Sequence, residues 1–198
     1  MTNQIISVGG ESPYSVVVGR ALLDDIIAAV RPDAKKILVI HPLALATSAE
    51  AFVDALRDRG FQAMAAGVED GESAKRIEVA AFCWGILGKQ EFSRSDAIIG
   101  FGGGAATDLA GFVASTWLRG VQLIQVPTTL LAMVDASVGG KTGINTAEGK
   151  NLVGTFYAPS AVFCDLDTLI TLPKNEIVAG FGEIVKYGFI ADERILEV

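Results

Sequence analysis

Short apolar runs alternate along this chain with segments whose apolar residues recur at helical spacing. Residues 36–41, 96–101 and 121–126 are short apolar runs, as expected of buried strands. Between them, apolar residues in 48–60 and 105–113 recur every three or four positions, which is typical of one helix face. This alternation indicates a parallel sheet covered by helices on both faces. We therefore expect an α/β fold with a doubly wound, mainly parallel, Rossmann-like sheet.

Further elements extend this pattern. We expect strands at 5–8, 14–18 and 61–66, a helix at 22–30, and a long, mostly buried helix at 73–92.

The chain changes character after Asp165. A helix is expected to begin around Pro173 and Glu176 and to run through Tyr187, and Asp192 is placed to cap a further helix. The sequence stops shortly afterwards. We therefore expect a first domain at 1–170 and, at 171–198, the truncated start of an α-helical second domain.

Charge and composition argue against several classes of protein. The 198 residues carry a net charge of −7, so a partner such as nucleic acid or an anionic membrane is not expected. The longest uncharged stretch, 120–134, is too short and too polar to span a membrane, and the amino terminus lacks the basic start of a signal peptide. Cys83 and Cys164 lie in apolar runs. We expect two buried, reduced thiols in a cytoplasmic protein.

Three successive glycines, 102–104, separate a predicted strand from a predicted helix. Such a turn lets the backbone approach a ligand closely, and the N–H groups at a helix start attract phosphate. The usual dinucleotide fingerprint fits poorly, because no acidic residue occurs between Leu109 and Val134. The motif therefore predicts either a pyrophosphate site or a turn that packs a helix closely on the sheet.

Other polar turns carry candidate ligand contacts. Residues 135–142 resemble a phosphate loop, but Asp135 stands where such a loop has its first glycine, so we reject this interpretation. Lys141 remains a candidate contact for an anion. Residues 70–75 form either a solvated turn or a ribose site. Thr128 and Thr129 follow a strand, where a hydroxyl can cap a helix or contact a ligand.

A predicted helix places Glu183, Lys186 and Tyr187 on one face. They form either a surface ion pair or part of a buried site, and the apolar, glycine-containing helix favours burial. His41 is the only histidine and is expected near the core, so the chain cannot build a metal site from several histidines.

Taken together, these segments resemble the 3-dehydroquinate synthase family of the shikimate pathway, and the composition is closest to that of actinobacterial members. The matching segments are 70–75, 102–116, 127–130, 133–145, 149–151 and 182–187. Residues 1–60 fit the family only in their strand and helix pattern.

The resemblance implies a lyase that converts the small phosphorylated sugar acid 3-deoxy-arabino-heptulosonate 7-phosphate into 3-dehydroquinate and phosphate. Transient oxidation by NAD is followed by phosphate elimination, reduction, ring opening and aldol closure. A divalent metal, zinc or cobalt, polarises the C5 oxygen of the substrate.

The family also implies roles for residues of this chain. Its cofactor positions correspond to Asp70, Gly71, Glu72, Lys75, Gly103, Gly104, Ala105, Thr107, Asp108, Thr128, Thr129, Lys141, Lys150, Thr168 and Leu169. Its substrate positions correspond to Arg119, Asp135, Lys141, Asn151 and Lys186, and its catalytic positions to Asp135, Lys141, Glu183 and Lys186.

Glu183 also corresponds to a metal ligand, whereas the family's two histidine ligands have no counterpart in this sequence. Arg119 implies a homodimer of the full-length enzyme, because the matching arginine reaches the neighbouring subunit's phosphate pocket. We expect this chain alone to bind metal poorly and to be weakly active or inactive. Two alternatives are a metal-dependent polyol dehydrogenase and a non-catalytic NAD-binding fragment.

Overall fold

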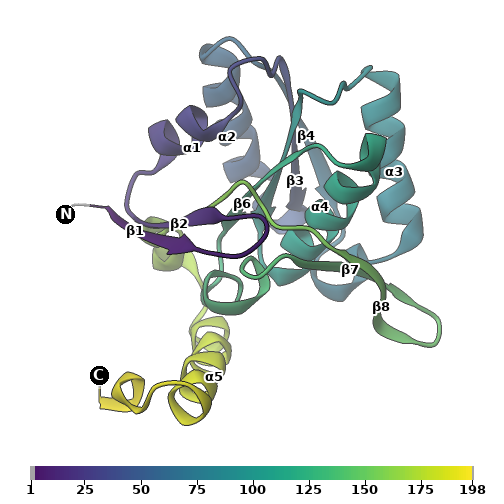
Figure 1. Ribbon diagram of the computed structural model, residues 1–198. Coiled ribbons are helices and arrows are strands. Elements are labelled where there is room, and N and C mark those ends of the chain that lie inside the picture. Colours follow the sequence, from purple (N-terminus) through teal and green to yellow (C-terminus); the bar gives the residue numbers. More distant parts are fainter. Residues whose placement is uncertain (1–2, 198) are drawn as a thin grey trace.

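A computed structural model describes residues 3–197 and shows a seven-stranded sheet with helices on both faces (Figure 1). The strand order is β1-β2-β9-β6-β5-β3-β4, and all neighbours are parallel except the antiparallel pair β1 and β2. The strands are β1 (Gln4–Val8), β2 (Tyr14–Gly19), β3 (Lys36–Pro42), β4 (Gln62–Val68), β5 (Ala97–Gly102), β6 (Gln122–Pro127) and β9 (Ala161–Asp165). The expected doubly wound, mainly parallel sheet is confirmed.

Four helices cover the sheet, two on each face. They are α1 (Leu23–Ala29), α2 (Ala46–Asp58), α3 (Ile77–Lys89) and α4 (Gly104–Thr116). Alternation along β3 explains the two layers: Ile37 and Val39 pack in the core with α1 and α2, whereas Leu38 and Ile40 pack with α3 and α4. Both faces of the central strands are therefore buried.

The order of the strands reverses between β3 and β5. From β3 the chain moves outward to edge strand β4 and then returns to β5, on the other side of β3. In doubly wound sheets, the carboxyl ends of the strands at such a switch point form a crevice that binds ligands. In this chain, Pro42 ends β3, and the run of three glycines begins at Gly102, the last residue of β5.

The expected, mostly buried helix at 73–92 is wrong in its first turns and in its burial, because only Ala80, Cys83 and Leu87 of the observed helix are buried. A short 3-10 helix (Gly71–Ala74) comes first, and α3 begins only at Ile77. Between them Lys75 and Arg76 leave the helical conformation, with Arg76 extended at φ −110° and ψ 153°. The break turns the Lys75 side chain into the protein, where only 2% of it is exposed.

A β-hairpin that the sequence did not predict lies beside α4 (Figure 1). Its strands are β7 (Lys141–Thr146) and β8 (Gly149–Phe156). A Cβ on Gly111 of α4 would meet Thr142 of the hairpin at 2.3 Å, so the glycine permits this close approach. The hairpin positions several polar side chains near the start of α4.

The last long helix, α5 (Lys174–Ile190), extends away from the sheet (Figure 1). Its predicted position is confirmed, but its expected burial is not: Phe181 and Phe189 are 52% and 74% exposed, and only Gly180 and Gly188 are buried. Asp192 then accepts a hydrogen bond from the Arg194 N–H, as expected of a cap.

Two further expectations concern the cysteines and membranes. Cys83 and Cys164 are buried free thiols, as predicted. Among the described residues, the structure has no helix with the length and apolar character needed to cross a membrane.

Candidate functional site

A cavity of about 550 Å³ opens at the switch point of the sheet. It lies between the carboxyl end of β3 with the segment that follows, which contribute Pro42 and Leu45, and the start of α4 after β5. Segments that follow β4, β6 and β9 complete the wall. A volume of this size is in the range that small-molecule ligands occupy.

The amino terminus of α4 contributes the most distinctive wall of this cavity. Gly103 is the N-cap residue, and no side chain of residues 3–197 caps the helix. At Gly102, a Cβ would lie 2.7 Å from Cδ of Pro42, so only glycine allows this turn to pass so close to β3. The first N–H groups of the helix are thus available to an anionic ligand.

The residues expected to bind a dinucleotide fall into two groups. The group that lines this cavity is Asp70, Gly71, Gly103, Gly104, Ala105, Thr128, Thr129 and Thr168. The group that does not line it is Glu72, Lys75, Thr107, Asp108, Lys141, Lys150 and Leu169. Thr107 is fully buried, and its hydroxyl donates to the Gly104 carbonyl oxygen at 2.9 Å. Its side chain therefore fixes the first turn of α4.

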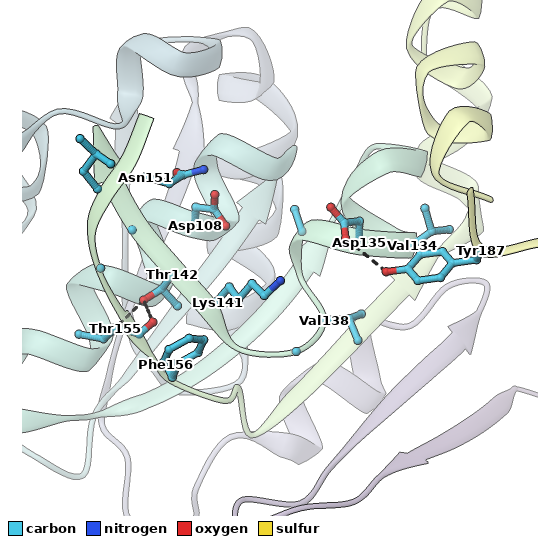
Figure 2. Close-up of a pocket in the computed structure, with 15 residues that line it drawn as sticks. Asp108, Val134, Asp135, Val138, Lys141, Thr142, Asn151, Thr155, Phe156 and Tyr187 are labelled. Carbon is cyan, nitrogen blue, oxygen red and sulfur yellow. Dashed lines mark hydrogen bonds between the residues drawn. The ribbon is translucent and has the colours of Figure 1, made fainter. Parts of the chain in front are cut away.

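A second cavity, of about 670 Å³, lies between the hairpin and α5 (Figure 2). Figure 2 shows the Lys141 side chain extended into it, with Asp108 on one side and Asp135 on the other. Asn151 lies on its wall, and the Tyr187 hydroxyl of α5 donates to Oδ1 of Asp135 at 3.4 Å. One ammonium and two carboxylates can therefore contact both the anionic group and the hydroxyls of a polar ligand.

Lys75 stands behind this cavity as a buried cation. Its ammonium donates to Oδ2 of Asp108 at 2.5 Å and to Oδ1 of Asn151. Burial raises the pKa of Asp108 above its ordinary value, against the opposing effect of the Lys75 hydrogen bond. Lys75 thereby stabilises the ionised form of a carboxylate at the cavity wall.

The described residues do not form a complete metal site. No group of three or more His, Cys, Asp or Glu side chains within 3–197 could hold an ion. Glu183 instead accepts a hydrogen bond from Lys186, its neighbour one turn along α5, and this bond raises the pKa of Lys186. A zinc or cobalt ion does not fit these residues by themselves, because one carboxylate does not make such a site.

The remaining predicted residues lie apart from the two cavities. Arg119 is exposed beyond α4 with φ +65°, and Glu183 and Lys186 do not line the second cavity. His41 is 3% exposed and its ring contacts the Pro42 carbonyl oxygen, which confirms its expected place near the core.

Sequence reasoning missed several lining residues. Pro42, Leu45 and Ser48 line the first cavity, and Leu152 and Phe156 line the second. The three residues of the first cavity could have been found because they lie at or just after the end of β3. The two residues of the second cavity could not, because they belong to the hairpin that the sequence did not predict.

The fold and these cavities define a Rossmann-like α/β domain that can hold ligands at the carboxyl edge of its sheet. Residues 65–179 match the family described as 3-dehydroquinate synthase N-terminal. The chain belongs to the 3-dehydroquinate synthase family, as its sequence motifs predicted.

Relatives extend this result over the whole sequence. A 3-dehydroquinate synthase of Paenarthrobacter aurescens (strain TC1) is 58% identical over 203 residues, covering 100% of this chain and 56% of the relative. The curated relatives that the chain matches include actinobacteria, and the chain spans about half their length.

Solved structures share the fold and carry bound cofactors. A 2-deoxy-scyllo-inosose synthase complexed with carbaglucose-6-phosphate, NAD+ and Co2+ is 27% identical with a TM-score of 0.85, over 93% of this chain and 50% of that one. ValA, a 2-epi-5-epi-valiolone synthase from Streptomyces hygroscopicus subsp. jinggangensis 5008 with NAD+ and Zn2+ bound, is 28% identical with a TM-score of 0.84, over 96% and 53%.

Proposed function

We propose that this chain binds NAD in the first cavity and forms the nucleotide-binding part of a 3-dehydroquinate synthase. The observation that carries the proposal is the uncapped start of α4, which meets a ligand-sized cavity at the switch point of the sheet. The pyrophosphate would lie at Gly103, Gly104 and Ala105. Asp70 and Gly71 would border the adenosine half, and Thr128, Thr129 and Thr168 would complete the site.

The proposed substrate is 3-deoxy-arabino-heptulosonate 7-phosphate, held in the second cavity. NAD, when bound, would supply an acceptor for the hydride of the substrate carbon that carries a hydroxyl, and it would return that hydride later. Lys141 binds an anionic group of the substrate, while Asp135 and Asn151 bind its hydroxyls. These contacts orient the sugar acid so that phosphate can leave and the product, 3-dehydroquinate, can form.

Three predicted roles go beyond the cavities and remain part of the proposal. Glu183 would serve as a zinc or cobalt ligand only together with ligands from outside the described residues. Arg119, which is exposed, would reach the substrate phosphate of a second subunit in a homodimer. Lys186 would contact the substrate from α5.

We also propose the domain boundary expected from the sequence, with an NAD-binding domain at 1–170 and the start of an α-helical domain at 171–198. The exposed apolar face of α5, with Phe181, Val185 and Phe189, supports this division. A helix with such a face is stabilised when a further layer of helices covers it. The greater length of the relatives is consistent with that layer.

Calorimetric titration of NAD into the chain tests the central proposal. Saturable binding is expected, and Ala105→Glu should weaken it at least tenfold. The added carboxylate repels pyrophosphate but suits a helix start, so the fold should survive. Ala51→Glu, on an exposed position of α2, adds the same charge elsewhere and should bind NAD normally. A folded chain that does not bind NAD would contradict the proposal.

A second assay tests the reaction. The separately produced carboxyl-terminal half of the Paenarthrobacter aurescens relative is added to this chain with NAD, metal and the proposed substrate. Phosphate release without net NADH formation is expected, because the hydride is returned. NADH that accumulates steadily with glycerol would support a polyol dehydrogenase instead.

A further inference from the structure

The β7–β8 hairpin carries an irregularity at Asn145. The strand pairing runs regularly from Lys141 to Ile144 and resumes at Thr146, so the register shifts at the residue between them. Such bulges free a backbone group from the strand ladder and redirect a side chain. The freed N–H of Asn145 donates at 2.6 Å to the carbonyl oxygen of Lys75, which belongs to a different segment of the fold.

The Asn145 side chain continues this connection in two directions. Its Nδ2 donates to Oε2 of Glu72 at 2.8 Å, in the short helix whose residues Gly71 and Ala74 line the first cavity. Its Oδ1 accepts the N–H of Asn151 at 2.9 Å. One asparagine therefore joins the loop at one cavity to a residue that lines the other.

The bond to Asn151 acts on a strained backbone position. Asn151 has φ +56°, a left-handed conformation that costs free energy and persists where neighbouring contacts offset the cost. The Asn145 side chain accepts the backbone N–H of Asn151, and the Lys75 ammonium donates to the side-chain oxygen of Asn151. The direction in which Asn151 faces the second cavity thus depends on the loop 70–75.

We propose that Asn145 is a positioning residue that couples the two cavities. A dinucleotide that orders the loop 70–75 fixes Asn145, and Asn145 fixes Asn151 for the substrate. By linkage, a ligand in the second cavity strengthens dinucleotide binding by the same factor. This inference rests on the proposed function, because it takes NAD as the ligand of the first cavity.

Hydrogen exchange with NAD as the only ligand tests the coupling. In the original chain, NAD should slow amide exchange both in the loop 70–75 and in the hairpin around Asn151, the latter by about fivefold or more. In Asn145→Ala, NAD should still slow exchange in the loop, but the hairpin should exchange at the same rate with and without NAD. The ratio of the hairpin exchange rates without and with NAD isolates the coupling. A substitution that merely loosened the hairpin would raise both rates and leave this ratio unchanged.

Two more variants sharpen the test. Asn145→Asp keeps an acceptor for the Asn151 N–H but sets a carboxylate against Glu72, so it should also lose the hairpin protection. Asn175→Ala removes an exposed asparagine of α5 and should behave like the original chain. If Asn145→Ala unfolds, Asn145→Asp carries the comparison.

The outcomes separate this inference from the proposed function. Hairpin protection that persists in the Asn145 variants, or that is absent from the original chain although NAD binds, would overturn the coupling alone. A chain to which NAD does not bind would overturn the proposed function, and the coupling with it.

Discussion

The ammonium nitrogen of Lys75 lies 2.5 Å from Oδ2 of Asp108, although the two residues are 33 positions apart. The Lys75 side chain is 2% exposed and that of Asp108 is 20% exposed, so the pair is largely removed from water. Removing one member of such a pair leaves the other charge without compensation. The pair therefore ties the loop before α3 to α4 at the wall of the second cavity.

Lys75→Met should lower the free energy of unfolding at pH 7 by about 3 kcal/mol, because Asp108 stays ionised without its cation. The Asp108 pKa is already raised by burial, and it should rise further in the variant. A raised carboxyl pKa makes the folded state relatively more stable at low pH. The deficit should therefore shrink as the pH falls through that pKa, as urea denaturation at several pH values can show.

Two variants control this experiment. Lys75→Met combined with Asp108→Asn removes both charges and should lose less stability than Lys75→Met alone. Arg59→Met breaks the exposed pair with Asp24 and should cost less than about 1 kcal/mol. Equal losses for Lys75→Met and Arg59→Met would contradict the importance of burial.

Asp96→Asn should lower the free energy of unfolding by about 2 kcal/mol at pH 7. Burial alone would raise the pKa of Asp96, but hydrogen bonds from the N–H groups of Ser93, Lys36 and Lys35 outweigh it and lower the pKa. The carboxylate thus stabilises the fold above its ordinary pKa of 3.8, and this contribution is lost as the pH falls through the lowered value.

The difference in the free energy of unfolding between Asp96→Asn and the original chain should accordingly become smaller at acidic pH. Denaturation curves from pH 7 to pH 3 measure it. Asp33→Asn, at an exposed position, should show no comparable change. A difference that stays constant over this range would show that the carboxylate charge is not responsible.

Gly102→Ala should destabilise the chain by about 2 kcal/mol, because its Cβ would meet Pro42 at 2.7 Å. Gly85→Ala is the matched substitution, since a Cβ there meets nothing within 4 Å inside α3. It should stabilise the chain by about 0.5 to 1 kcal/mol. Thermal unfolding followed by circular dichroism should move in opposite directions for the two variants.

Cys83 and Cys164 should react slowly with a thiol reagent in the folded chain. Burial raises the pKa of each thiol to about 12, so little thiolate exists near neutral pH. Denaturant should release both for rapid reaction. Fast labelling of either cysteine under native conditions would show that its surroundings open more readily than the structure indicates.

The sequence predicted the central sheet well because its strands are buried on both faces and their apolar runs are uninterrupted. The hairpin was missed for the opposite reason. Its strands contain glycine, asparagine and lysine, and β8 is mostly exposed, so neither shows the alternation of a half-buried strand. Their position depends on contact with α4, which no local pattern reveals.

The candidate site divides in the same way. Residues that directly follow strands, such as Gly103 and Thr128, could be placed from sequence, since parallel strands end at one edge. Lys75 could not, because its inward turn depends on a carboxylate far along the chain. The burial of α5 was overestimated. An apolar helix face indicates that other residues can cover it, but it does not show which residues do so.

Helix α4 takes part in both cavities, through Gly104 at the first and Asp108 at the second. With a rise of 1.5 Å per residue, these positions are about 6 Å apart along the helix axis. The geometry of the helix main chain therefore fixes the distance between the two cavity walls. One residue inserted between these positions would turn Asp108 by about 100° and point it away from the second cavity, however well every other contact were preserved.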